Sequence, residues 1–334
     1  MFMLPTEPTA LIAGANGRLG RVLAGWFARR GWRVRALVRS AETADLPAGV
    51  EVFEGDARNH VDLIRAGQGA DVIVNAINVP YTQWDPAQLE IADAMILAAR
   101  ETGATHLFPG NVYNYGCPMP EVISDTTPQR ALTRKGALRI EMERRFREAA
   151  DLFGVQTLIL RAGDFFGGSG RGSWFDLVIA ARLSKSKVVY PGPLNITHSW
   201  AYLPDLAEAF ELVALRRAEF ETFETFCFPG HTVTGMEMVE AVERALGEEM
   251  QVSRLPWTML RLAAPFVPLW AEVSEIAYLW HVPHTLDGGK LELAIGEIPA
   301  TPFDKAVADT LQTLGINKHP HRPAIGLRPA SSAG

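Results

Sequence analysis

The sequence predicts an α/β fold, in which a doubly wound parallel sheet is combined with a smaller, mostly C-terminal lobe. Short apolar strands alternate with amphipathic helices up to about residue 167. Such alternation is typical of a parallel sheet that is covered by helices on both faces. The chain has 334 residues, 48% of them apolar, which is enough for one large domain or two lobes with a substantial core.

Each predicted element rests on a local pattern. Residues 9–13 form a short apolar run, as expected of a buried strand. The next helix, predicted at 18–30, ends near Gly31 and has apolar residues at helical spacing, namely Leu19, Val22, Leu23, Trp26 and Phe27. The same reasoning predicts strands at 32–38, 50–53, 72–74, 105–108 and 155–160, and helices at about 86–102 and 128–150.

A glycine loop joins the first predicted strand to the first predicted helix, and it reads Gly14-Ala15-Asn16-Gly17-Arg18-Leu19-Gly20. The first glycine permits the tight turn, the second lets a pyrophosphate approach the backbone, and the third lets the helix pack closely on the sheet. The pyrophosphate would lie against free N–H groups at the helix N-terminus. The loop therefore predicts a Rossmann domain that binds a dinucleotide, with further contacts from Asp56, Ala57 and Ala76.

The residue at the end of the second strand predicts which dinucleotide is preferred. An acidic residue there would bind the ribose 2′-hydroxyl of NAD, but this chain has Arg39. Arg39 and Arg18 could clamp a 2′-phosphate, so we expect NADP(H) to be preferred, with NAD(H) possible. In the alternative, both arginines are surface residues and Glu42 binds the ribose of NAD. Asp56 is expected at the adenine edge, or else as a helix cap.

The chain resembles the extended short-chain dehydrogenase/reductases, which include NAD-dependent epimerases, dehydratases and reductases. The resemblance covers most of the chain and implies a Rossmann domain with a small substrate lobe. It rests on Gly14-x-x-Gly17-x-x-Gly20, Gly55-Asp56, Val112-Tyr113, Lys135, Leu160-Arg161 followed by Gly167, and Tyr202-Leu203-Pro204-Asp205-Leu206-Ala207.

The chain departs from this family at the residues that carry its chemistry. The resemblance implies a Tyr-x-x-x-Lys motif and a serine after the fifth strand, but no tyrosine here precedes a lysine by four positions. Lys135 matches the family lysine, Ala131 stands at the tyrosine position, and Asn111 lies in the serine region. The chain thus resembles an atypical member of the family, and the standard mechanism cannot be carried over.

Other residues could replace the missing acid. Tyr113 and Tyr115 follow the fifth strand, where ligands bind in open α/β folds, and either could donate a proton or pack. Asn111 could bind a carbonyl oxygen, and Lys135 could bind ribose, act as an acid or be a surface lysine. Two further candidates for proton transfer are Asp164, which could also cap a turn, and His198, which could also be structural.

Aromatic residues near these positions are candidate substrate contacts, although each could equally belong to the core. They are Tyr81, Trp84, Tyr115, Phe166, Trp174 and Trp200. We expect the dinucleotide-binding domain to comprise 1–167 and about 195–230. The substrate lobe would comprise 168–194 and 231–317, and 318–334 would form a flexible tail.

Composition limits the partners and the location. The net charge is -6 and the basic residues are scattered, so no nucleic-acid partner is expected. The two cysteines form no CxxC pair, which indicates a reducing compartment and no metal site. The apolar stretch 257–270 is too short to span a membrane, and it predicts a core helix broken by proline, or a lid or interface segment. We expect a cytoplasmic protein, with no membrane partner and a possible homodimer.

Three functions fit these observations. The first is an NADP(H)-dependent oxidoreductase that acts on a small carbonyl or alcohol with a non-standard proton donor. The second is an epimerase or dehydratase that retains and recycles NAD. The third is a redox sensor that binds NADP(H) without turnover.

Overall fold

The computed structural model describes residues 7–316, and the predicted tail 318–334 lies outside these residues. A seven-stranded sheet organises the larger lobe, and every adjacent pair of its strands is parallel. Its strand order is β11-β7-β5-β4-β1-β2-β3. The strands are β1 (Thr9–Ala13), β2 (Arg33–Val38), β3 (Glu51–Glu54), β4 (Val72–Asn75), β5 (Thr105–Gly110), β7 (Thr157–Arg161) and β11 (Phe223–Cys227).

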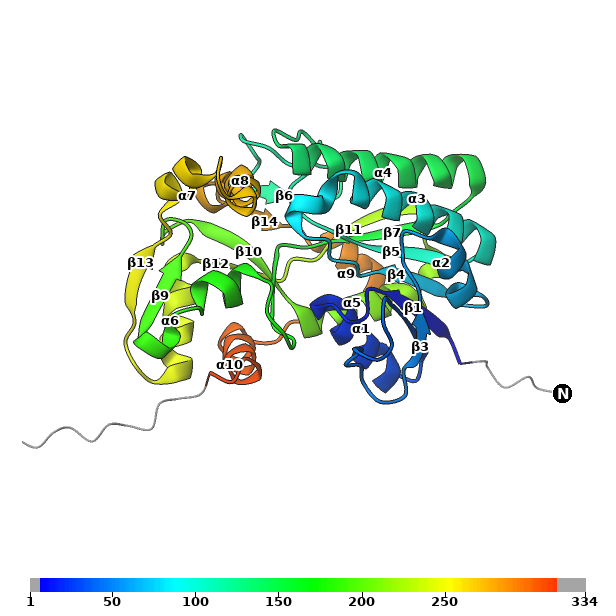
Figure 1. The fold of residues 1–334 in the computed structure, drawn as a ribbon, viewed down its shortest axis with the longest axis horizontal. Helices are drawn as coiled ribbons and strands as arrows, with labels where there is room; N and C mark the ends of the chain where they lie inside the picture. The colour runs from blue at the N-terminus through cyan, green and yellow to red at the C-terminus, as the bar shows by residue number, and fades with distance from the viewer. Residues whose placement is uncertain (1–6, 317–334) are drawn as a thin grey trace, which may run out of the picture.

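Helices cover both faces of this sheet, as predicted (Figure 1). One layer contains α1 (Arg18–Arg29), α5 (Leu203–Leu215) and α9 (Gly289–Ile295). The other contains α2 (His60–Gly67), α3 (Trp84–Thr102) and α4 (Arg134–Phe153). The strand order reverses between β1 and β4, which is the topological switch point where ligands bind in such sheets.

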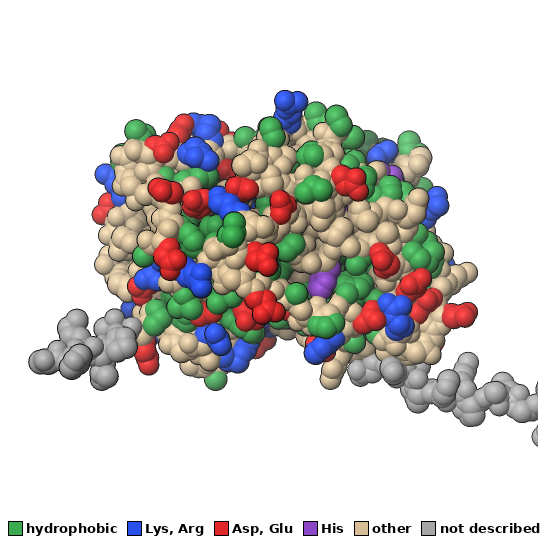
Figure 2. All heavy atoms as spheres, turned by 180° about the vertical axis from the view of Figure 1, so that it is seen from behind, with side chains coloured by type: hydrophobic (Ala, Val, Ile, Leu, Met, Phe, Trp, Pro, Cys, Tyr) green, Lys and Arg blue, Asp and Glu red, His purple; other side chains and the backbone are tan. Residues whose placement is uncertain are grey.

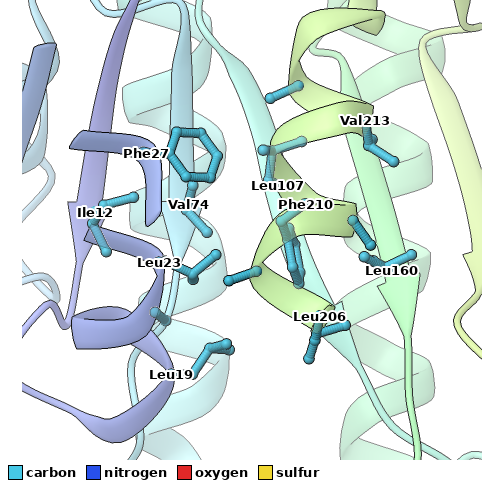
Figure 3. Packing of buried hydrophobic residues seen from close by; sticks show 14 of the residues in the cluster. Ile12, Leu19, Leu23, Phe27, Val74, Leu107, Leu160, Leu206, Phe210 and Val213 are labelled. Carbon is cyan, nitrogen blue, oxygen red and sulfur yellow. The ribbon is translucent and has the colours of Figure 1, made fainter. Parts of the chain in front are cut away.

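The main core lies between the sheet and the layer of α1 and α5 (Figure 3). Apolar side chains from six strands of the sheet meet those of α1, α5 and α9, and full burial of each large side chain contributes about 1.5–3 kcal/mol. The labelled residues are Ile12, Val74, Leu107 and Leu160 from the sheet, Leu19, Leu23 and Phe27 from α1, and Leu206, Phe210 and Val213 from α5. This core fixes the start of α1 relative to β1.

The second lobe is built from smaller sheets and helices. Its three-stranded sheet has the order β12 (His231–Thr234), β10 (Thr197–Tyr202), β8 (Asp164–Phe166). Two further strand pairs are β9 (Lys187–Tyr190) with β13 (Gln251–Arg254), and β6 (Val122–Ile123) with β14 (Thr285–Leu286). Its helices are α6 (Gly235–Leu246), α7 (Trp257–Ala263), α8 (Pro268–Glu275) and α10 (Phe303–Thr313), and its short helical turns are η2 (Phe175–Ile179), η3 (Leu183–Lys185) and η5 (Ala277–His281). Two further turns contact helices of the larger lobe, η1 (Tyr81–Gln83) before α3 and η4 (Arg217–Glu219) after α5.

Several element boundaries differ from the sequence prediction. The helix expected from 128 begins at Arg134, because the Thr133 hydroxyl caps it by accepting a hydrogen bond from Gly136 N at 3.0 Å. The short helix α2, which was not predicted, is capped by Asn59. Helix α9 packs on α5 and β11 and so lies with the large sheet, although the sequence assigned it to the substrate lobe.

The apolar stretch 257–270 is not a core helix, so that prediction is wrong. It forms α7 and the start of α8, with Pro265 between the two helices and Pro268 as the first residue of α8. Trp257 packs on the core of the second lobe, but several other apolar side chains of the stretch are exposed. Met259 is 68% exposed, Leu262 74% and Phe266 85%. Hydropathy alone does not reveal whether an element is present to cover an apolar face, and the alternative, a lid or interface segment, stays a prediction.

Two surface features bear on the expected partners. Within residues 7–316, no helix combines the length and the apolar character that crossing a membrane requires. Acidic and basic side chains are interspersed on the face seen from behind (Figure 2). The predicted absence of a nucleic-acid partner stays a prediction.

Candidate functional site

The glycine loop has the geometry that a dinucleotide pyrophosphate needs. Gly14 has φ +83°, and a Cβ there would lie 2.8 Å from Ala76 O. A Cβ on Gly20 would collide with the Gly14 carbonyl, and one on Gly17 would lie 3.2 Å from it. Gly17 also occupies the N-cap of α1 without any side-chain cap. The backbone at the start of α1 therefore stays accessible to an anion, and the residues present fit NAD(P)H.

At the adenosine end, Arg39 is exposed at the end of β2 and has no hydrogen bond or ion pair within residues 7–316. Asp56 is already paired, because its carboxylate accepts hydrogen bonds from Arg58 at 2.6–3.2 Å. The bond from the Arg58 side chain lowers the pKa of Asp56. The cap of α2 is Asn59, so the alternative role of Asp56 as that cap is wrong.

Arg18 does not point to the adenosine end, which corrects the expectation that it helps to clamp a 2′-phosphate. Its guanidinium donates to Gly167 O at 2.7 Å and pairs with Asp176 at 3.1 Å. Asp176 belongs to the second lobe, so Arg18 joins the two lobes across the start of α1. Arg39 is left as the predicted cation at the adenosine end.

The remaining loop residues have mixed roles. The Asn16 side chain accepts hydrogen bonds from Arg21 at 3.2 Å and from Asp45 N at 3.3 Å, which orders the loop. Leu19 belongs to the main core and Ala57 packs beside the neighbouring core cluster. Of these, Asn16 alone has a polar side chain for a ligand, and their cofactor contacts stay predictions.

Two tyrosines from different elements form a hydroxyl pair beyond the ends of β4 and β5. Tyr81, in η1, and Tyr113, which follows β5, have their hydroxyl oxygens 2.8 Å apart. Burial raises the pKa of Tyr81 to about 12 and raises that of Tyr113 as well. Asn111 positions this loop, because its side-chain oxygen accepts a hydrogen bond from Tyr113 N at 3.0 Å. The pair stays protonated at neutral pH and can donate a proton.

Asp164 and His198, both predicted from the sequence, form a second pair. Asp164 Oδ2 lies 2.8 Å from His198 Nε2, since β8 and β10 run side by side. The His198 ring stacks on Trp280 at 4.2 Å, and its Nδ1 is buried without a hydrogen-bond partner within residues 7–316. The negative charge of Asp164 adds to the effect of burial in raising the pKa of both Tyr81 and Tyr113. Asp164 thus lies close enough to act electrostatically on the tyrosine pair.

Lys135 is almost fully buried, at 3% exposure, and faces the second lobe. Its ammonium group is bound by Glu272 and by Glu275, the latter at 2.8 Å, and both carboxylates come from α8. The Lys135 amide also donates to Glu275 at 3.1 Å. These two carboxylates use two of the three donors of the ammonium group, and the predicted roles of Lys135 toward ribose or substrate stay predictions.

Sequence reasoning missed the cation one turn further along α4. The Arg139 guanidinium carbon lies 4.8 Å from the Trp84 ring centroid and 5.2 Å from that of Phe108. Its Nε is buried, and the side chain has no hydrogen bond or carboxylate partner among the described residues. Its spacing of four residues from Lys135 on a predicted helix is the signal that could have revealed it.

A buried ion pair supports the loop after β5 from beneath. Arg161 is completely buried and donates to both carboxylate oxygens of Glu143, at 2.8 and 3.0 Å. It also donates to Asn111 O at 2.6 Å, and its guanidinium lies 5.4 Å from the Tyr115 ring centroid. Tyr115 is only 2% exposed, so the structure gives it a packing role rather than contact with substrate.

The other predicted substrate contacts divide into core and accessible residues. Phe166 and Trp200 are completely buried and pack edge to face in the second lobe, which corrects their expected role. Trp84 is 6% exposed and donates to Val79 O. Trp174 is partly exposed beside Trp280, at 5.1 Å between ring centroids. Tyr81 and Trp174 therefore remain the predicted aromatic contacts with the most accessible side chains.

Comparisons with known proteins agree with this geometry. An NAD(P)H-binding family profile matches residues 14–139. The sequence matches no curated protein. The resemblance inferred from the sequence is confirmed at the level of the fold, because the chain shares the fold of solved epimerase structures. The chain contains an NAD(P)-binding domain.

Three solved structures illustrate the similarity, and at these identities they establish the fold alone. UDP-glucose 4-epimerase from Thermotoga maritima, with UDP-glucose, is 13% identical, covers 92% of this chain and 98% of its own, and has a TM-score of 0.74. UDP-glucose 4-epimerase from Brucella ovis, in complex with NAD, is 15% identical over 91% and 97%, with a TM-score of 0.71. A UDP-galactose 4-epimerase is 18% identical over 92% and 98%, with a TM-score of 0.70.

Proposed function

We propose that this protein is an NADP(H)-dependent oxidoreductase that acts on a small carbonyl or alcohol substrate. The observation that carries the proposal is the glycine loop at β1, with Arg39 beside it and polar side chains of both lobes beyond β4 and β5. When bound, the nicotinamide supplies or accepts the hydride. The protein must then orient the substrate and move one proton.

The preference for NADP(H) rests on Arg39. Its side chain is exposed and free of carboxylate partners within the described residues, while Asp56 is already paired with Arg58. A 2′-phosphate would form an ion pair with Arg39, whereas the ribose 2′-hydroxyl of NAD carries no charge for the guanidinium to pair with.

The tyrosine pair is our candidate for the proton donor. Its hydroxyl groups are protonated at neutral pH, and Tyr81 is the more accessible of the two. A carboxylate only accepts hydrogen bonds, so His198 presents a protonated Nε2 to Asp164, and its Nδ1 lone pair is left as a hydrogen-bond acceptor. We assign to Asp164 and His198 the replacement of the proton that the tyrosine pair gives up.

Calorimetric titration with all four dinucleotides tests the cofactor assignment. NADPH should bind about 10- to 100-fold more tightly than NADH, and Arg39→Ser should remove most of this difference. Equal affinity for the two in the wild type would contradict the preference, and no binding of any dinucleotide would contradict the whole proposal. A carbonyl panel with NADPH, followed by absorbance at 340 nm, then tests turnover.

Two alternatives have observations in their favour. Similarity to UDP-sugar epimerases, one of them in complex with NAD, favours an epimerase that retains NAD. Release of NAD from denatured, freshly purified protein would support that alternative.

The missing Tyr-x-x-x-Lys motif and the occupied Lys135 favour a redox sensor instead. Tight NADPH binding without turnover, together with binding of a protein partner that depends on the redox state, would support the sensor. The expected homodimer and cytoplasmic location also stay predictions.

A further inference from the structure

Arg139, a partly buried side chain whose Nε is fully buried, differs from the buried cations Lys135 and Arg161 around the site. Lys135 and Arg161 each have carboxylate partners, whereas Arg139 has none among residues 7–316. Glu143, one turn further along the same helix, is occupied by Arg161, Asn114 and Gln129. Removing a guanidinium from water without a partner is unfavourable, and two aromatic rings offset only part of that cost. The arrangement leaves hydrogen-bond donors available for a ligand.

The position of Arg139 indicates which ligand group it would meet. A dinucleotide whose pyrophosphate lies at the start of α1 crosses the carboxyl ends of the strands at the switch point between β1 and β4. With the adenosine over β2 and β3, the nicotinamide nucleoside must lie over β4 and β5. Arg139 lies against Phe108 of β5 and Trp84, and it is close enough to act electrostatically on Tyr81 and Tyr113, which follow these two strands.

We propose that Arg139, rather than Lys135, is the cationic donor for the nicotinamide half of the cofactor. Its guanidinium binds the ribose of the nicotinamide nucleoside and faces the hydroxyl pair of Tyr81 and Tyr113. This inference rests on the proposed cofactor site and adds to it a residue that the sequence motif did not indicate.

The two cations of α4 differ in their partners, which gives the cofactor site a free donor although Lys135 is bound to α8. One turn of α4 separates Lys135 from Arg139, so both side chains lie on the same side of the helix. The first is held by Glu272 and Glu275, and the second keeps its donors. The charge of Arg139 also acts against burial, because it lowers the pKa values of both tyrosines and so eases proton donation.

Cofactor affinity tests this proposal without knowledge of the substrate. We would titrate wild type, Arg139→Met, Arg139→Lys and the control Arg147→Met with NADPH and with 2′-phospho-ADP, which lacks the nicotinamide nucleoside. Arg147 is an exposed arginine two turns further along α4. Arg139→Met should bind NADPH about 10- to 100-fold more weakly and 2′-phospho-ADP as tightly as wild type. Arg139→Lys should recover part of the loss, and Arg147→Met should match wild type.

The outcomes separate this inference from the proposed function. Unchanged NADPH affinity in Arg139→Met would overturn the inference and leave the cofactor assignment intact. An equal loss of affinity for NADPH and for 2′-phospho-ADP would also overturn the inference, because the substitution would then not act at the nicotinamide half of the cofactor. A wild type that binds neither ligand would refute the proposed function itself. Thermal unfolding without ligand checks folding, and Arg139→Met should melt at or above the wild-type temperature, since it removes an unpaired charge.

Discussion

Replacement of Lys135 by methionine would test the ion cluster that joins α4 to α8. The substitution keeps most of the apolar stem and removes the charge that two carboxylates share. The side chains of Glu272 and Glu275 are only 17% and 15% exposed. Arg134, which is 80% exposed, would be the remaining cation, at 3.0 Å from one carboxylate and 3.8 Å from the other. The folded state would then hold two poorly compensated negative charges.

The size of the effect follows from the burial of these groups. Removing one partner of a fully buried ion pair costs about 3–5 kcal/mol. Partial exposure and Arg134 reduce this, so we expect about 2–3 kcal/mol for Lys135→Met. With an unfolding entropy of about 2 cal/mol/K per residue, the melting temperature should fall by roughly 3–5 °C.

The assay is calorimetric unfolding at pH 7 of wild type, of Lys135→Met and of a triple variant that adds Glu272→Gln and Glu275→Gln. The triple variant should recover most of the lost stability, because its buried groups are neutral. In wild type, burial raises the pKa of Glu275, but hydrogen bonds from Lys135 outweigh this and lower it. The wild type therefore loses this contribution as pH falls through that lowered pKa, and the gap between the variants should narrow in acid. A single variant as stable as wild type at pH 7, or a triple variant no better than the single one, would refute this reasoning.

Three further predictions concern other parts of the molecule. Gly20→Ala should weaken binding of NADPH at least 10-fold in a titration, because the added Cβ collides with the backbone of the glycine loop. Unchanged affinity would contradict the assignment of this loop as the pyrophosphate site. Glu143→Gln should lower the free energy of unfolding by about 3–5 kcal/mol, because it leaves the buried guanidinium of Arg161 without its carboxylate. The control Glu141→Gln, on the exposed side of α4, should lower it by less than about 1 kcal/mol. Burial lowers the pKa values of His106 and His284 to about 3. The free energy of unfolding should therefore be highest above pH 6.5 and should fall between pH 6.5 and 3, where the unfolded chain takes up protons that the folded chain does not. A free energy of unfolding that stays constant in this window would contradict the prediction.

The parallel sheet could be predicted because its central strands are buried on both faces. Residues 9–13 were predicted as a strand, and β1 has these bounds with every residue buried. Continuous apolar runs of this kind are typical of such strands, and the glycines between them mark conformations with positive φ, as at Gly14. The cofactor loop was therefore recognisable from local chemistry alone.

Other features could not be predicted because their environment lies elsewhere in the chain. The stretch 257–270 is apolar enough for a core, yet no element within residues 7–316 covers Phe266. Arg18 lies in the cofactor loop, but the loop after β8 and the η2 turn bring Gly167 O and Asp176 to its guanidinium. Neither contact leaves a local trace in the sequence.

The sequence by itself determined the sheet, the glycine loop and the absence of the Tyr-x-x-x-Lys motif, since each depends on residues that are neighbours along the chain. Only the tertiary structure decided which side chains act on one another. Tyr81 meets Tyr113 and Asp164 meets His198 across more than 30 residues, and Lys135 meets Glu275 across 140. The physical reason is that the order of strands in the sheet, and the packing of α8 on the first lobe, bring together groups whose spacing in sequence carries no information about their distance.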